Sequence, residues 1–164
     1  MKTNELLSRY AAGQRDFREV DLIAANLRNA NLSYANLSGA KLISAKLSGA
    51  ILTKANLSHV DLSGAKLISA KLSGAILTKA NLTKTDLNQT NLSYVHLCGA
   101  DLCSATLCNV DLTGANLSGA NLSGANFSKA NLAMTNLTNV DLSDINLSGA
   151  NLSGAIMPDG TTHN

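Results

Sequence analysis

Residues 115–124 read Ala-Asn-Leu-Ser-Gly-Ala-Asn-Leu-Ser-Gly, which is two copies of a five-residue unit centred on leucine. This leucine period runs through residues 22–152 with one exception, Phe127, and Phe17 and Met157 continue it outward. On an α-helix a step of five residues turns the side chain by about 140°, so the leucines would be scattered around every face. In a continuous strand an odd period alternates faces. We therefore predict a solenoid, in which the chain turns a corner in every unit and keeps its leucines inside.

The other four residues of the unit have distinct roles. From Arg15 to Asp159 there are 29 consecutive units, and the residue two before the central one is alanine in 19 of them, which indicates a small inward slot. The residue directly before the centre is Asn or Asp in 20 units, which indicates a polar outward slot. The two residues after the centre, most often Ser and then Gly, are expected to form the corner.

The corners predict specific backbone conformations. Every glycine within the array is the second of the two corner residues. A type II turn needs positive φ at that place, and glycine adopts positive φ without strain. The same conformation is costly for other residues. We therefore expect type I or irregular corners where a larger residue stands there, as at Tyr34, Lys54, Lys79, Ser104 and Met134.

The ends of the chain differ from the array. Residues 1–14 predict a short helix with Thr3 as its N-cap and Gly13 at its end, whose apolar face would cover the first open turn of the solenoid. Residues 15–159 form the repeat array, and residues 160–164 form a tail. Pro158 stands in a corner slot and cannot donate a ladder hydrogen bond, so the solenoid should stop there.

Composition restricts the class of protein. The chain has 45% hydrophobic residues but only two Phe, three Tyr and no Trp, fewer aromatic residues than a globular core would contain. No apolar stretch is long enough for a signal peptide core or a membrane span, so we expect no membrane association. Three cysteines, an odd number, favour a reduced compartment over a disulfide framework. These features predict a cytoplasmic protein.

Units such as Ala115-Asn116-Leu117-Ser118-Gly119 resemble the pentapeptide repeat family, whose pattern is A(D/N)LXX, over nearly the whole chain. The first helix and the ending Ile156-Met157-Pro158-Asp159-Gly160 resemble small cyanobacterial members. The resemblance implies an all-β solenoid, a right-handed quadrilateral β-helix with four units per rung. On that basis 29 units would make about seven rungs behind a short N-terminal capping helix.

The clearest departures from the repeat are basic. Residues 37–57 and 62–82 are identical, and within these copies the Asn/Asp slot holds Ile51 and Ile76 as well as four lysines: Lys41, Lys46, Lys66 and Lys71. With 20 residues per rung, Lys46 and Lys66 would stack directly. Residues 1–84 carry 12 Lys/Arg and five acids (+7), whereas residues 85–164 carry one Lys and six Asp (−5). Arg28, Lys46, Lys66 and Lys71 therefore form a candidate surface for an anion or a partner. The alternative is a solvated face whose lysines discourage edge pairing.

A second candidate is the group of His96, Cys98, Cys103 and Cys108, which has metal-ligand chemistry. Structural zinc sites favour closely spaced cysteine pairs, whereas these cysteines recur every five residues and should face different directions. We therefore expect no metal and no cofactor. No histidine has a nearby nucleophile and acid, and a packed interior leaves no substrate cleft, so we expect no catalytic residues and no enzyme activity.

These observations favour a non-catalytic scaffold that binds an unidentified protein partner. The last rung lacks a capping helix and could also form a homodimer. One alternative, implied by the resemblance, is a DNA mimic that modulates a type II topoisomerase. A net charge of +2 disfavours this mimicry. We also expect nucleic acid to be an unlikely partner. A metal-binding protein that uses His96 and the cysteines is the remaining alternative.

Overall fold

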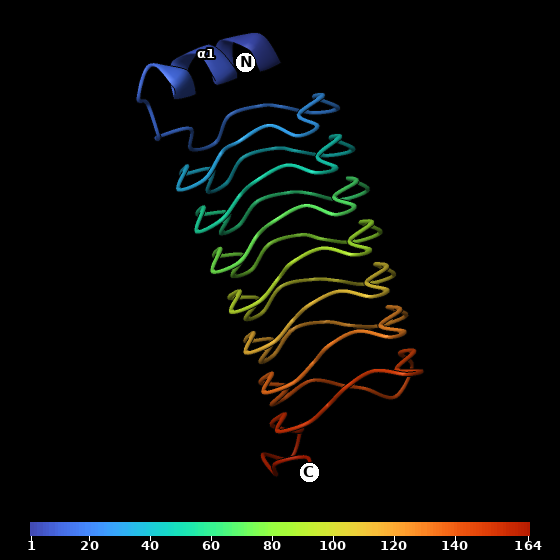
Figure 1. The fold of residues 1–164 in the computed structure, drawn as a ribbon. Coiled ribbons are helices and arrows are strands. Elements are labelled where there is room, and N and C mark those ends of the chain that lie inside the picture. Colours follow the sequence, from blue (N-terminus) through green and yellow to red (C-terminus); the bar gives the residue numbers. More distant parts are fainter.

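The computed structural model describes all 164 residues and contains a single helix, α1 (Thr3–Ala11), followed by a coil of stacked turns (Figure 1). Adjacent turns are joined by parallel bridges between residues 20 apart, such as Asp16 with Asn36 and Asp21 with Lys41. One turn therefore contains four five-residue units. This confirms the prediction of a repeat β-helix with one short helix. Its straight sides are very short, because each bridge involves one residue from each turn and no longer strand forms. No helix is long and apolar enough to cross a membrane.

The coil has four sides, each named here by its first bridging residue. In every unit the side chain of the residue before the central one points outward, and this residue bridges to a neighbouring turn in all units except that of Asp141. The Asp16 side continues with Asn36, Asn56, Ile76, His96, Asn116, Asn136 and Ile156; the Asp21 side with Lys41, Asp61, Asn81, Asp101, Asn121 and Asp141; the Asn26 side with Lys46, Lys66, Asp86, Thr106, Asn126 and Asn146; and the Asn31 side with Ile51, Lys71, Asn91, Asp111, Asn131 and Asn151.

A set of three main-chain hydrogen bonds joins each side to the same side of the next turn. Leu37 N–H donates to Asn56 O at 2.8 Å, and Gly39 N–H donates to Ser58 O at 2.9 Å. In the opposite direction, Asn56 N–H donates to Ala35 O at 2.9 Å. The set recurs along the array, so a single turn cannot satisfy its own backbone groups and needs its neighbours.

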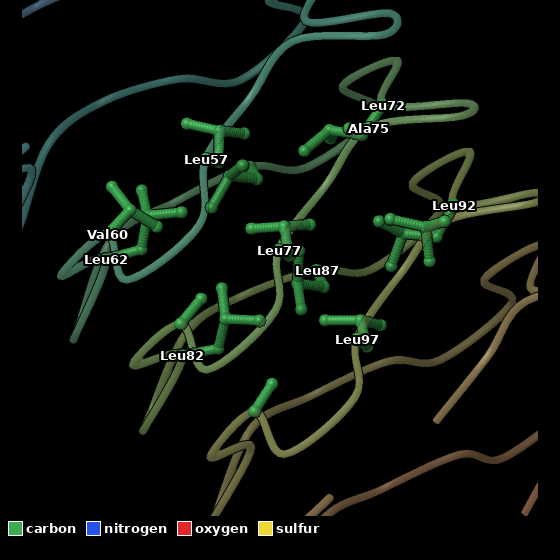
Figure 2. Packing of buried hydrophobic residues seen from close by; sticks show 14 of the residues in the cluster. Leu57, Val60, Leu62, Leu72, Ala75, Leu77, Leu82, Leu87, Leu92 and Leu97 are labelled. Carbon is green, nitrogen blue, oxygen red and sulfur yellow. The ribbon is translucent and has the colours of Figure 1, made fainter. Parts of the chain in front are cut away.

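The interior is a continuous column of leucine and alanine. Side chains from successive turns lie one above another, as Leu57, Leu77 and Leu97 do in Figure 2. From Leu22 to Leu137 the central residues are at most 2% exposed. Where threonine replaces the small inward residue, its hydroxyl is satisfied by the backbone: Thr135 donates to Leu112 O at 2.9 Å. The core therefore contains no unsatisfied polar side chain.

The prediction for the corners was partly wrong. The glycine corners have positive φ as expected, for example +67° at Gly39. The larger residues have it too: φ is +62° at Tyr34, +55° at Lys54 and +57° at Met134, and Lys79 and Ser104 behave in the same way. A left-handed residue costs roughly 1–2 kcal/mol. A different corner would displace the flanking buried leucines, whose burial is worth about 1.5–3 kcal/mol each. The coil therefore imposes one corner on nearly all residue types.

Corner side chains lean toward the following turn, where glycine often provides the space. A Cβ atom built on Gly114 would lie 2.6 Å from Cε1 of Tyr94, and one on Gly49 would lie 2.1 Å from Oδ1 of Asn29. Gly119 follows another glycine, Gly99, and a Cβ atom there would meet nothing within 4 Å.

Helix α1 closes the N-terminal end of the coil (Figure 1). Leu6 is fully buried against the core, and the Tyr10 hydroxyl donates to Ser33 O at 2.9 Å. The N-cap is Lys2, which makes no side-chain capping bond, so the prediction of Thr3 as N-cap was wrong by one residue. Thr3 already has helical geometry because the helix begins there. Gly13 follows the helix with φ of +102°, as expected for a glycine that ends a helix.

The C-terminal end is covered less completely. After Pro158 the chain folds back, and Ile156 forms an antiparallel bridge with Thr162. The leucines of the last turn, Leu142, Leu147 and Leu152, are only partly buried, unlike those of the preceding turns. The tail therefore leaves part of the end of the core accessible.

Candidate functional site

The Asn/Asp slot on the outer sides has a structural role that the sequence reading missed. Its side-chain oxygen accepts the N–H of the residue two later, which begins the corner: Ser38 N–H donates to Oδ1 of Asn36 at 3.1 Å. Ser58 donates both its N–H (3.0 Å) and its hydroxyl (2.8 Å) to Oδ1 of Asn56. This is an Asx turn, and it stabilises the corner locally. The signal was present in the sequence as the recurring Asn-Leu-Ser triplet.

The lysines and isoleucines within the duplicated segments forgo this bond. Neither side chain can accept a hydrogen bond. At Lys46 and Lys66, the corner N–H groups of Ser48 and Ile68 donate to no side chain, whereas the corners after Asn56 and Asp61 are capped. A typical hydrogen bond contributes about 0.5–1.5 kcal/mol. The duplicated segments therefore give up local stability at the residues that place positive charge on the surface.

The four residues of the predicted basic patch lie around one edge of the coil. Lys46 and Lys66 are bridge partners on the Asn26 side, which confirms their predicted stacking. Arg28 stands in the corner that follows Asn26, and Lys71 lies on the adjoining Asn31 side. All four side chains are exposed.

None of these four cations has a counter-charge within 4 Å. The two salt bridges of the chain lie elsewhere, between Arg9 and Glu5 and between Arg18 and Asp16. Lys41 lies between Asp21 and Asp61 on its own side, whereas Lys66 has Lys46 as one bridge partner and Asp86 as the other. The patch of Arg28, Lys46, Lys66 and Lys71 is therefore a positively charged surface whose members form no salt bridge.

The cysteines of the second candidate group do not converge. Cys98, Cys103 and Cys108 are free, and each starts a different, successive corner. The Sγ atoms of Cys98 and Cys108 accept from Ser118 (3.5 Å) and Ser128 (3.2 Å) of the next turn, and Cys103 contacts Ser104. No three His, Cys, Asp or Glu side chains are grouped so that they could hold an ion.

Three carboxyl groups have a pKa below the usual value for aspartate. The pKa of Asp16 is lowered by its hydrogen bonds from the Arg18 side chain and then from the Arg18 backbone. Hydrogen bonds from Ser143 lower the pKa of Asp141, and those from Thr161 lower that of Asp159, in both cases with the side-chain bond as the larger cause. These groups are solvent-exposed aspartates at capped corners, which is not the environment of a catalytic acid.

The surface has three open hollows. The first, of about 450 Å³, lies between α1 and the first turn and includes Arg9 and Arg18. The second, of about 400 Å³, lies along one edge beside Gly39 and His59. The third, of about 220 Å³, opens on the Asp21 side between Ser123 and Asp144. None of them contains a nucleophile with an aligned base.

Comparison with known proteins finds the same five-residue repeat in the sequence. The sequence model of the pentapeptide repeats matches residues 16–53, 55–93, 80–119 and 107–144, with 8 copies. The solved structure of HetL, a pentapeptide repeat protein involved in heterocyst differentiation regulation from the cyanobacterium Nostoc sp. strain PCC 7120, shares 34% identity over 99% of this chain and 100% of that one, with a TM-score of 0.32. A pentapeptide repeat protein from the Arabidopsis thaliana thylakoid lumen shares 31% identity over 72% of both chains, with a TM-score of 0.41.

A more distant similarity is found to QnrB1, a plasmid-mediated fluoroquinolone resistance protein. The identity is 17% over 85% of this chain and 71% of that one, with a TM-score of 0.47. No curated protein sequence matches the chain significantly.

Proposed function

Because this chain belongs to the pentapeptide repeat family, we propose that it is a non-catalytic scaffold whose outer surface binds an acidic protein partner through Arg28, Lys46, Lys66 and Lys71. The observation that carries the proposal is that three of these four cations replace a corner-capping Asn or Asp and that none of the four forms a salt bridge. Residues that break a favourable local pattern without structural compensation are expected at functional surfaces. We also infer the right-handed sense and the roughly seven rungs (29 units, four per rung) that the family resemblance implies.

The partner surface is expected to be acidic and rather flat. The patch occupies a straight edge of the coil, so the partner must present carboxylates along a line, not a single deep pocket. Charged contacts of this type increase the association rate, and they weaken with added salt. The similarity to HetL does not identify the partner, because the repeat residues that define the family form the core and the corners.

A charge-reversal experiment tests the proposal. Lys46→Glu/Lys66→Glu is compared with Lys79→Glu/Lys84→Glu, an equal change of charge at exposed corner lysines outside the patch. Affinity capture from the native cell should retain the partner on wild type and on the control pair, and lose it on the patch pair. Equal retention by both pairs would exclude the patch as the binding surface.

A homodimer through the last turn is a second proposal. The partial exposure of Leu142, Leu147 and Leu152 supports it, because a second copy could cover these side chains. Light scattering over a range of concentrations tests it. A mass that stays monomeric at the highest concentration would count against self-association.

DNA mimicry has weaker support. It requires a continuous acidic surface, whereas Lys41 interrupts the Asp21 side between Asp21 and Asp61, and the net charge is +2. A gyrase supercoiling assay decides between the scaffold and the DNA mimic. The scaffold is expected to have no effect on supercoiling even at high concentration, whereas a DNA mimic should change it.

A further inference from the structure

The main-chain ladder is open at one place on the Asp21 side, between residues 120–124 and residues 141–144. One turn earlier on the same side the usual three bonds are present: Leu102 N–H to Asn121 O (2.8 Å), Ser104 N–H to Ser123 O (2.8 Å) and Asn121 N–H to Ala100 O (2.9 Å). Across the opening, the bridge and all three equivalent bonds are absent. We call this opening in the ladder the slot, as distinct from the positions of the five-residue unit.

The separation is confined to one side of the coil. On the next side Phe127 N–H donates to Asn146 O at 2.7 Å, and Asn146 N–H donates to Ala125 O at 3.1 Å. On the preceding side Leu117 N–H donates to Asn136 O at 2.9 Å. The slot is therefore a local opening between two sides that remain bonded.

Asp144 has an unusual conformation at this opening. Each corner has two residues, and from Glu19 to Gly154 Asp144 is the only second one that lacks positive φ. Its carboxylate accepts a hydrogen bond from the Ser123 hydroxyl at 2.9 Å, so a side-chain contact replaces the main-chain pairing at the mouth of the slot. The resulting cavity has a volume of about 220 Å³.

The lip formed by residues 120–124 presents backbone groups that have lost their partners. Leu122 N–H and Gly124 N–H have no acceptor within the protein, and Ala120 O has no donor from the next turn. Ala120 and Leu122 are 5% and 2% exposed. Backbone groups in such buried surroundings are nearly always paired, because leaving one unpaired costs about 1–3 kcal/mol. Donors and acceptors in this order match the edge of an extended strand.

The charge around the slot selects the side chains of the occupant. Asp141 and Asp144 stand at the slot, and Asp101 lies two turns before Asp141 on the same side. None of the three forms a salt bridge. The only cationic Lys or Arg side chain after residue 84 is Lys129, on another corner.

We propose that the slot binds an extended peptide segment of a partner protein that carries lysine or arginine side chains. Binding breaks the hydrogen bond from the Ser123 hydroxyl to Asp144 and moves residues 141–144 away from the lip. The segment then pairs its backbone with Leu122, Gly124 and Ala120, and it places its cations beside Asp141 and Asp144. Main-chain pairing supplies affinity and the carboxylates supply selectivity, as in other cases of strand addition. This site does not depend on the basic patch, which lies in the other half of the chain.

The test uses the full chain and an eight-residue synthetic peptide in which Thr and Lys alternate. Amide hydrogen exchange is followed by NMR at Leu122 and Gly124, with Leu102 and Ser104 as paired reference amides on the same side. In the free protein, Leu122 and Gly124 should exchange at least about tenfold faster than the references, and saturating peptide should slow them by about tenfold.

Three comparisons separate the contributions to binding. Replacing lysine by glutamine in the peptide should weaken binding by at least about fivefold, as should Asp141→Asn/Asp144→Asn in the protein. Asp111→Asn, on the Asn31 side, should leave binding unchanged. A peptide whose alternate amides are N-methylated should bind at least about fivefold more weakly, because it cannot pair with the lip.

Several results would overturn the proposal. If Leu122 and Gly124 are already as protected as Leu102 and Ser104 in the free protein, the slot is closed in solution. If the peptide leaves their exchange unchanged, or if the N-methylated peptide binds equally well, the lip does not pair with a strand. Equal binding of the lysine and glutamine peptides would remove the role of Asp141 and Asp144.

Discussion

A corner glycine in this coil matters for the space it leaves more than for the turn it makes. Residues as large as Tyr34 adopt the same positive φ, so the turn itself does not require glycine. What glycine provides is room for the side chain of the previous turn. Tyr94 lies over Gly114 in this way, whereas Gly119 follows Gly99 and has free space around it.

This difference leads to a matched pair of substitutions. Both Gly114 and Gly119 have φ of +67°, so alanine at either should cost roughly 1 kcal/mol of backbone strain. Gly114→Ala should cost about 1 kcal/mol more, because its methyl group meets the ring of Tyr94. Urea unfolding measures both free energies. The excess should disappear in a Tyr94→Ala background, and equal costs in the wild-type background would contradict the packing explanation.

At the scale of elements, α1 acts as the cover of the first turn. Its nine residues are too few for a stable isolated helix. Its order must therefore come from contact with the coil, chiefly through Leu6 and through the bond from Tyr10 to Ser33. The first turn depends on α1 in return, since its inner residues would otherwise face water.

Leu6→Ala should loosen both partners in this contact. The expected loss of stability is about 2–4 kcal/mol, and it should be local, because each turn contacts only its neighbours. Hydrogen exchange should accelerate at Phe17 and Leu22 and remain slow at Leu97 and Leu117. Leu7→Ala, at a partly buried residue of the same helix, is the control and should have a smaller effect. Uniform acceleration along the whole chain would instead indicate a single cooperative unit.

The sequence predicted the coil well because the leucine period leaves few alternatives. It also predicted that Lys46 and Lys66 stack, once 20 residues per turn were assumed. The corners at Lys54 and Met134 were mispredicted, because local backbone preference was weighed without the burial of the flanking leucines. The slot had no sequence signal, since Asp144 differs in conformation from other non-glycine corners through a contact with Ser123 that only folding creates.

At the scale of the whole molecule, the basic patch follows from the mismatch between a 25-residue duplication and a 20-residue turn. Residues 37–57 recur as 62–82, one side further round the coil. Lys41 of the first copy, which lies between two aspartates, becomes Lys66 of the second copy, which lies between Lys46 and Asp86. The duplication thus places like charges together that were apart in the original segment.

Restoring the repeat pattern at this place should stabilise the protein. Lys66→Asn removes both the repulsion with Lys46 and the attraction to Asp86, so the charge effects of its two neighbours largely cancel. It also allows the side chain to cap the N–H of Ile68, so the free energy of unfolding should rise by about 1 kcal/mol. Lys84→Gln, which removes a charge from a corner outside the patch, should change it by less than about 0.5 kcal/mol. Thermal or urea unfolding measures both. A Lys66→Asn variant no more stable than Lys84→Gln would contradict the trade of stability for surface charge.

The 20-residue turn also shapes how such a chain can diversify. A tandem copy of any number of five-residue units preserves the leucine core, so gene duplications of many lengths yield foldable products. The length of the copy then decides the side of the coil on which its outward residues lie. A copy of 20 residues adds them to the side they already occupy, and a copy of 25, 30 or 35 residues places them on one of the other three sides. Mutation can therefore relocate an established group of surface residues without any new substitution, a freedom that few globular folds possess.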